Sequence, residues 1–357
     1  MNPEGLAALA RPEIRALKPY ASARALADSA GILLNANESP WPPAGDGGLG
    51  LNRYPDPQPA GLKLRLAELY QARPENLLVT RGSDEGIDLL MRVFCRAGQD
   101  RVLVCPPCFG MYALSARVQG ADVVQAPLVD TGDTFELPDD LSEKAGGCRI
   151  AFLCSPNNPT GNTIRAETVS ALATAQEGTG LVVVDEAYVE FAPETSMIPL
   201  LAEHPNVVLL RTLSKAHALA GCRLGAVIAD PVIIDLLRRI IAPYPLPTPT
   251  VAIAMDALTE ASLTGEREHL ATLAAERGRV TEALVSSPGI AKVWPGAANF
   301  VLVRAIDGPQ LVQTAAAAGI HLRDQSAQPG LGDCVRITIG TPEENNALIG
   351  FMREWNS

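Results

Sequence analysis

The sequence predicts an α/β protein: a large domain with a mostly parallel sheet covered by helices, followed by a smaller α/β domain. Three observations support this fold class. Short apolar runs alternate with amphipathic stretches, 47% of the 357 residues are hydrophobic, and a proline-rich segment interrupts the pattern at residues 242–249. Short, wholly apolar strands separated by helices are typical of parallel sheets buried on both faces. A chain of this length suits two domains that share a crevice.

The large domain is expected at residues 51–245. Its predicted strands are 76–80, 101–105, 149–154, 180–184, 207–210 and 224–229, and its first predicted helices are 62–70 and 83–95. Ligands of such sheets bind beyond the carboxyl ends of the strands. Side chains that directly follow these strands are therefore the candidates for a functional site.

Two further regions flank the large domain. Residues 1–50 are rich in proline and glycine and predict an N-terminal arm or a part of the smaller domain. The four prolines of residues 242–249 predict the domain boundary. Residues 246–357 then predict the small domain, with a helix over about 266–285 and strands at 299–303 and 334–339.

Composition limits the function classes. The net charge of -11 argues against nucleic acid and anionic membranes as partners. Seven scattered cysteines do not form the pattern of a disulfide framework. The N-terminus lacks a secretory signal, and no apolar run is long enough to span a bilayer. We therefore expect a cytoplasmic enzyme that acts on small molecules.

Lys215 is the strongest candidate for a catalytic residue. It follows a buried strand, in a chain with only five lysines against twenty-four arginines. An amine at such a place can be neutral enough to attack a carbonyl, whereas a guanidinium keeps its proton. Asp185 and Tyr188 follow another buried strand, and Arg223 lies eight residues past the lysine. Because a buried carboxylate needs a partner, these residues together predict a pocket for pyridoxal phosphate.

Weaker signals accompany these residues. Gly82 and Ser83 join a strand to a helix, where free amides can hold a phosphate, although simple helix capping by Ser83 is the better explanation of this segment taken alone. Asp84 is an odd neighbour for a phosphate and stays ambiguous. Asn158 lies in a turn-forming stretch, 155–161, and either completes the turn or donates a hydrogen bond to a ring oxygen.

The segment after strand 101–105 allows two interpretations. Phe109 is either a core residue or a flat face for stacking on a ring. Cys105 and Cys108 form a CxxC pair, which leaves a dithiol redox site possible. We expect no metal site, because no second cysteine pair has zinc spacing and the four histidines are dispersed.

Two nucleotide-binding patterns are rejected. A phosphate-binding P-loop would need a Gly-Lys dipeptide, which the chain lacks. The GxGxxG of residues 45–50 follows prolines rather than a strand, and no helix opens on it.

Taken in their order along the chain, these motifs resemble those of fold-type I pyridoxal phosphate enzymes of the aspartate aminotransferase superfamily. They resemble the histidinol-phosphate aminotransferase family more closely. The resemblance runs nearly end to end. The segments that carry it are 34–40, 53–57, 155–161, 185–188, 212–215, 322–325 and 336–341. The family often has Thr-Tyr where this chain has Cys108 and Phe109, which keeps ring stacking but loses a phenol.

The resemblance implies a role for each candidate residue. Lys215 would form the Schiff base, Asp185 would pair with the pyridinium nitrogen, and Tyr188 and Asn158 would hold the ring oxygen. Further cofactor contacts would come from Gly82, Ser83, Asp84, Phe109, Thr212, Ser214 and Arg223, and from Tyr54 of the neighbouring subunit, which implies a homodimer. Substrate contacts would come from Tyr20, Asn158, Tyr244, Arg323 and Arg336, with both arginines at the anionic end of the substrate.

The implied reaction is transamination of L-histidinol phosphate with 2-oxoglutarate in L-histidine biosynthesis. The products would be imidazole-acetol phosphate and L-glutamate, by a ping-pong route through the pyridoxamine form. Two alternatives on the same fold are an aromatic amino acid aminotransferase and a phosphothreonine decarboxylase. A distant alternative is a dithiol oxidoreductase that uses Cys105 and Cys108.

Overall fold

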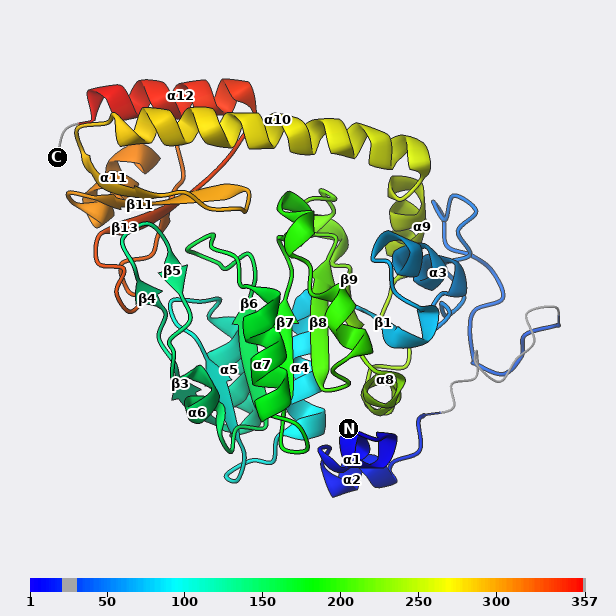
Figure 1. The fold of residues 1–357 in the computed structure, drawn as a ribbon. Coiled ribbons are helices and arrows are strands. Elements are labelled where there is room, and N and C mark those ends of the chain that lie inside the picture. Colours follow the sequence, from blue (N-terminus) through cyan, green and yellow to red (C-terminus); the bar gives the residue numbers. More distant parts are fainter. Residues whose placement is uncertain (21–30, 356–357) are drawn as a thin grey trace.

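Two sheets organise the chain (Figure 1), a computed structural model in which residues 1–20 and 31–355 are described. The larger sheet has seven strands in the order β1-β9-β8-β7-β6-β2-β3, and the smaller has four in the order β10-β11-β13-β12. A two-stranded hairpin, β4 (Val129–Asp130) and β5 (Phe135–Glu136), lies between them. The predicted α/β class is confirmed.

The seven-stranded sheet is mostly parallel, as expected. Its strands are β1 (Leu77–Thr80), β2 (Arg101–Val104), β3 (Asp122–Gln125), β6 (Ile150–Cys154), β7 (Leu181–Asp185), β8 (Val207–Thr212) and β9 (Gly225–Ile228). The run from β3 to β8 is parallel, while β9 pairs antiparallel with both β8 and β1. The central strands are buried along their whole length, which explains why they are apolar runs rather than alternating patterns.

Helices cover both faces of this sheet. Helices α4 (Gly82–Phe94), α5 (Met111–Gln119) and α8 (Pro231–Arg238) contribute to one core, and α3 (Ala60–Leu69), α6 (Leu141–Ala145), α7 (Ala166–Ala175) and α9 (Thr248–Ala257) to the other. Short 3-10 turns follow at η1 (Pro74–Asn76), η2 (Val189–Phe191), η3 (Pro193–Thr195), η4 (Ile198–Ala202) and η5 (Ala220–Cys222). Because helices bury both faces of the sheet, its strands are held in place. The carboxyl ends of the parallel strands therefore lie together at one edge of the sheet.

The first residues differ from the expected arm. Helices α1 (Pro3–Ala8) and α2 (Pro12–Ala16) pack Leu6 and Ile14 into the same core as α8. Asn2 caps α1 by accepting a hydrogen bond from the Gly5 amide at 2.8 Å, and proline at the first position favours the helix start. Residues 31–59 contain no helix or strand.

The smaller sheet is antiparallel and consists of β10 (Ile290–Trp294), β11 (Phe300–Ala305), β12 (Arg323–Asp324) and β13 (Cys334–Thr338). Helices α10 (Glu260–Val285), α11 (Gly308–Ala317) and α12 (Pro342–Glu354) build its core. In Figure 1, α10 runs from α9 above the large sheet to the small sheet, where it lies beside α12.

The division of the chain at residues 50 and 245 stays a prediction. Helix α9, beyond residue 245, packs against α3 on the large sheet, and α10 leads from it across to the small sheet. Among the described helices, none combines the length and apolarity that crossing a bilayer requires.

Candidate active site

A cavity of about 240 Å³ lies where the carboxyl ends of β6, β7 and β8 meet the start of α4. This is the edge at which parallel α/β sheets bind their ligands. Eleven residues that the sequence singled out line it: Ser83, Asp84, Phe109, Asn158, Asp185, Tyr188, Thr212, Ser214, Lys215, Arg223 and Arg336. Cys154 and Ala187 also line it and were not predicted.

Lys215 presents its amine to this cavity from the loop after β8. Its Nζ lies 5.5 Å from the centroid of the Tyr188 ring. Burial lowers the pKa of Lys215, and Arg336 and Arg223 lower it further, while Asp185 and Asp84 oppose them. A larger fraction of neutral amine makes this lysine a better nucleophile and base than an exposed one.

Asp185 ends β7 as a buried carboxylate that is only 3% exposed. It accepts a hydrogen bond from the Tyr112 hydroxyl at 2.7 Å and one from the Ala187 amide at 3.1 Å. Burial raises its pKa to about 6, although both hydrogen bonds act to lower it. Within residues 1–20 and 31–355, no cation forms an ion pair with Asp185, so the site lacks a positive charge that a ligand could supply.

Tyr112 is a site residue that the sequence analysis missed. It lies in the first turn of α5, three residues after Phe109, and its ring stacks on Phe152 at 4.9 Å between centroids. The ring is part of the core, so the apolar pattern concealed the hydroxyl. Phe109 precedes this helix, so its spacing from Tyr112 did not mark a shared helical face.

The start of α4 forms an anion-binding corner. Gly82 has φ +76, and a Cβ there would lie 2.8 Å from Nη2 of Arg223. A Cβ on Gly225 would lie 2.6 Å from the carbonyl carbon of Gly82, so both glycines are needed for the close approach of α4 to β9. The free amides of α4 and its dipole favour an anion at this point.

Hydroxyl and guanidinium donors converge on the same corner. Arg223, at φ +53, donates to Ser214 Oγ and to Asp84 Oδ2, both at 3.2 Å. The hydroxyl of Thr212 donates to Ser214 Oγ at 2.9 Å. Asp84 was ambiguous from sequence; the structure places it at the cavity, where its charge is paired with Arg223.

The opposite wall joins the two sheets. Asn158 donates from Nδ2 to the Tyr188 hydroxyl at 3.3 Å and accepts from Nη1 of Arg336 at 2.6 Å. The Arg336 guanidinium lies over the Phe300 ring at 5.4 Å. Its Nε is buried and has no hydrogen-bond partner in the described part of the chain, so a donor remains for an anionic ligand.

Five predicted residues do not line the cavity of this chain, and Gly82 is one of them. Tyr54 and Tyr244 stack on each other at 4.3 Å between centroids. Tyr20 is 72% exposed. Arg323 is exposed and lies opposite Arg336 in the β12–β13 pairing.

The CxxC pair lies in an environment that disfavours redox chemistry. Cys105 is buried, and burial raises the pKa of its thiol. Burial also raises the pKa of Cys108 to about 12. Both sulfurs are therefore protonated at neutral pH, whereas a reactive dithiol needs a thiolate. No group of His, Cys, Asp and Glu in the described residues could hold a metal ion.

Comparison with known proteins decides the family. The family model "Aminotransferase class I and II" matches residues 34–351. The chain belongs to this family. This aminotransferase is 48% identical over 348 residues to the histidinol-phosphate aminotransferase of Stenotrophomonas maltophilia, which covers 97% of this chain and 96% of that protein. It is also 48% identical to that of Xylella fastidiosa, with the same two coverages.

A solved structure adds the cofactor. Histidinol-phosphate aminotransferase from Sinorhizobium meliloti, in complex with pyridoxal-5'-phosphate, is 28% identical, with a TM-score of 0.76 and 89% of each chain covered. The resemblance to histidinol-phosphate aminotransferases and the fold-type I architecture are confirmed. The aminotransferase depends on pyridoxal phosphate.

The residues present fit this cofactor. A buried carboxylate without a cation, an amine of lowered pKa and a corner of anion donors surround one cavity. The carboxylate matches the protonated ring nitrogen of the cofactor, the amine matches its aldehyde, and the anion donors match its phosphate.

Proposed function

We propose that this enzyme transfers the amino group between L-histidinol phosphate and 2-oxoglutarate, in L-histidine biosynthesis. The observation that carries the proposal is one cavity in which Lys215, Asp185 and Arg336 meet. The full-length similarity to enzymes named for this substrate supports it.

We assign the proton chemistry to residues at the end of β7 and after β8. When bound, pyridoxal phosphate acts as the electron sink for the substrate Cα. Asp185 would keep the ring nitrogen protonated, because a cation there removes the cost of its buried charge. Lys215 would move the proton from Cα as a base of suitably low pKa. Tyr188, held by Asn158, would donate its hydroxyl to the ring oxygen.

We assign the remaining cofactor contacts to the anion-binding corner and one aromatic face. Phe109 would stack on the ring. The phosphate would be held by Gly82, Ser83, Asp84, Thr212, Ser214 and Arg223, in which Arg223 supplies a forked donor that lysine could not replace. The carboxylate of Asp84 would orient that guanidinium rather than touch the anion.

We assign the substrate contacts to Arg336, Arg323, Asn158, Tyr20 and Tyr244. The adjacent positions of Arg336 and Arg323 on β13 and β12 support a doubly anionic group there. Tyr54 would reach the phosphate from a second copy, so the enzyme would be a homodimer. Its exposure in the single chain supports this. We also propose that the enzyme works in the cytoplasm, with no nucleic acid or membrane as partner.

The alternatives predict different chemistry in the same cavity. An aromatic amino acid aminotransferase would bind an α-carboxylate where histidinol phosphate carries its phosphate ester, and a phosphothreonine decarboxylase would break the bond from Cα to the carboxylate. The dithiol alternative is the weakest, because both thiols of the pair are held protonated.

An absorbance titration of the holoenzyme separates these functions. We expect L-histidinol phosphate and L-glutamate each to convert the bound cofactor to the pyridoxamine form. A response to phenylalanine but not to histidinol phosphate would favour the aromatic enzyme. Release of CO₂ from O-phosphothreonine would favour the decarboxylase. Replacing Cys105 and Cys108 by serine should leave transamination largely intact.

A further inference from the structure

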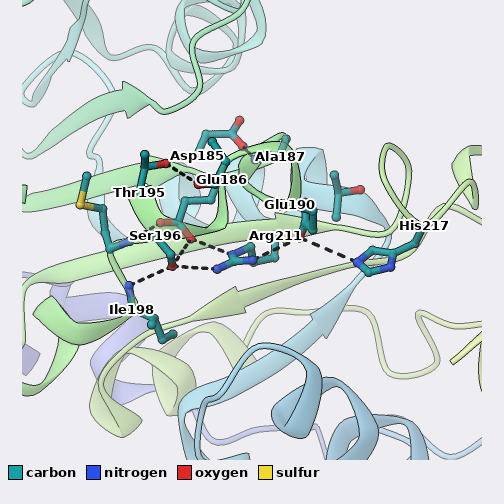
Figure 2. Close-up of polar contacts among 12 residues, drawn as sticks. Asp185, Glu186, Ala187, Glu190, Thr195, Ser196, Ile198, Arg211 and His217 are labelled. Carbon is teal, nitrogen blue, oxygen red and sulfur yellow. Dashed lines mark hydrogen bonds and ion pairs between the residues drawn. The ribbon is translucent and has the colours of Figure 1, made fainter. Parts of the chain in front are cut away.

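A buried charged network lies beside the loop that presents Lys215 (Figure 2). Arg211, near the end of β8, donates from Nε to Glu186 at 2.7 Å and from Nη1 to Glu190 at 3.1 Å. Its Nη2 donates to Ser196 Oγ at 3.0 Å. This network anchors the strand that leads into the Lys215 loop.

His217 extends the network from within that loop. It lies two residues after Lys215, and its side chain is only 3% exposed. Its Nε2 faces Glu190 Oε1 at 3.8 Å, an ion-pair distance that Figure 2 marks with a dashed line. Its Nδ1 lies 2.8 Å from Oε2 of Glu266, which belongs to α10. A buried imidazole between two carboxylates is best accounted for as a doubly protonated ring.

The same helix contacts the other side of the active site. Arg277, three turns further along α10, donates from Nη1 to the carbonyls of Ala297 and Ala298 at 2.7 and 2.9 Å. Ala298 packs in one cluster with Tyr188. The Ala297 amide donates to the Gly161 carbonyl at 2.7 Å, next to the stretch that carries Asn158.

We propose that His217 is a positioning residue that ties the Lys215 loop to α10. Helix α10 then positions both sides of the cavity. Through Glu266 it positions the Lys215 amine, and through Arg277 it positions the side of the cavity that carries Tyr188. This inference rests on the proposed function, since it gives His217 a part in turnover. Without the contact between His217 and Glu266, Arg211 would still hold the strand before the loop. The loop itself would no longer be fixed relative to α10 and the small sheet.

The charges around His217 set the pH range of the tie. Burial alone would lower the pKa of His217, but Glu190 and Glu266 outweigh it and raise this pKa to about 9. Arg211 pairs with Glu190 on the far side, and buried Tyr70 lies beside the guanidinium at 5.1 Å. Because the folded pKa lies above the ordinary value of 6.5, the tie is complete below that pH and is lost as pH rises through about 9.

The test compares the holoenzymes of wild type, His217→Gln and Glu266→Gln. We expect each variant to lose about tenfold in kcat at neutral pH with little change in KM, as displacement of a reacting group by part of an ångström predicts. The double variant should be no worse than either single one, because both remove the same ion pair. His204→Gln is the matched control, since the His204 ring lies 2.8 Å from Ser170 Oγ, away from the Lys215 loop, and the variant should behave as wild type.

Two readouts need no substrate. A histidine NMR signal that titrates near pH 9 should be present in wild type and His204→Gln and absent in His217→Gln. The pH midpoint of the cofactor absorbance change, which reports the Lys215 linkage, should move in both tie variants but not in the control. Wild-type kcat and an unmoved midpoint in Glu266→Gln would overturn the proposal, even if His217→Gln does not fold. Failure of wild type to use histidinol phosphate would overturn the proposed function alone.

Discussion

Asp185 and Glu186 are neighbours at the end of β7, and both are buried, at 3% and 0% exposure. Their surroundings differ. Glu186 accepts from Arg211 Nε at 2.7 Å and from Ser196 Oγ at 3.3 Å, so its charge is balanced within the chain (Figure 2). Within the described part of the chain, the hydrogen-bond donors to Asp185 are the neutral groups of Tyr112 and Ala187.

The electrostatics of the two sides follow this difference. Burial alone would lower the pKa of Arg211, but Glu186 and Glu190 more than offset it and raise this pKa, as expected of a paired cation. Burial raises the pKa of both acids, that of Asp185 to about 6; for Glu186 the Arg211 cation opposes this rise, whereas for Asp185 the neutral donors Tyr112 and Ala187 oppose it. A buried acid paired in the fold serves structure, whereas an unpaired one at a cavity is reserved for a ligand.

Among the substitutions at the cavity, we expect Lys215→Ala to have the largest effect. We expect a loss of at least about 10³-fold in turnover, because the proposed general base is removed. Some cofactor should remain bound without a covalent link, since the anion-binding corner is untouched. Steady-state rates and cofactor absorbance measure both effects. Lys144→Ala is the control, because Lys144 forms an ion pair with Asp140 at the surface. A fully active Lys215→Ala enzyme would contradict the proposed mechanism.

Asp185→Asn separates the two neighbours by function. We expect a fall in kcat of roughly 10²–10³-fold and weaker cofactor binding, because a preorganised charge at the ring nitrogen is lost. Glu186→Gln should keep far more of its rate per folded molecule. Near-normal kinetics in Asp185→Asn would mean that another group holds the nitrogen.

Glu186→Gln separates them by stability. Removing one member of a buried ion pair leaves Arg211 short of charge, so we expect a loss of about 3 kcal/mol in the free energy of unfolding. Urea denaturation of the cofactor-free protein measures it. Glu260→Gln, which breaks an exposed pair with Arg267, should cost less than about 1 kcal/mol. Equal losses in the two variants would contradict the comparison.

The pH dependence of stability sharpens the same contrast. Because the folded pKa of Asp185 is raised from 3.8 to about 6, its contribution is fully present below pH 3.8 and is lost as pH rises through about 6. The cofactor-free wild type should therefore lose roughly 2 kcal/mol relative to Asp185→Asn between pH 4 and 7. A constant difference across this range would show that Asp185 is already paired.

Much of this site could be predicted from the sequence, because each candidate follows an apolar strand and parallel strands end at one edge. The choice between Asp185 and Glu186 could not be made from strand geometry. As consecutive residues at the end of a strand, Asp185 and Glu186 point to opposite faces of the sheet. Which face borders the cavity depends on how the helices pack. Arg211 was a readable signal, since an arginine within an apolar strand needs an acidic partner.

Other features depend on contacts that no local pattern encodes. The Tyr112 ring completes the core, so its hydroxyl at Asp185 was not apparent. Helices α1 and α2 were hidden by the glycine and proline content of the residues that follow them. The roles of Tyr54 and Tyr20 stay predictions, because Tyr54 would act on a second subunit and Tyr20 does not line the cavity of this chain. The link from His217 to Glu266 joins positions 49 apart and required the path of α10.

The most direct test is the unfolding free energy of cofactor-free Asp185→Asn at pH 8, measured beside wild type. If Asp185 is an unpaired acid kept for the cofactor, the variant should be at least as stable as wild type, and by up to about 3 kcal/mol more stable. A loss of stability as large as that of Glu186→Gln would contradict the account, because it would show that the fold itself depends on the Asp185 charge.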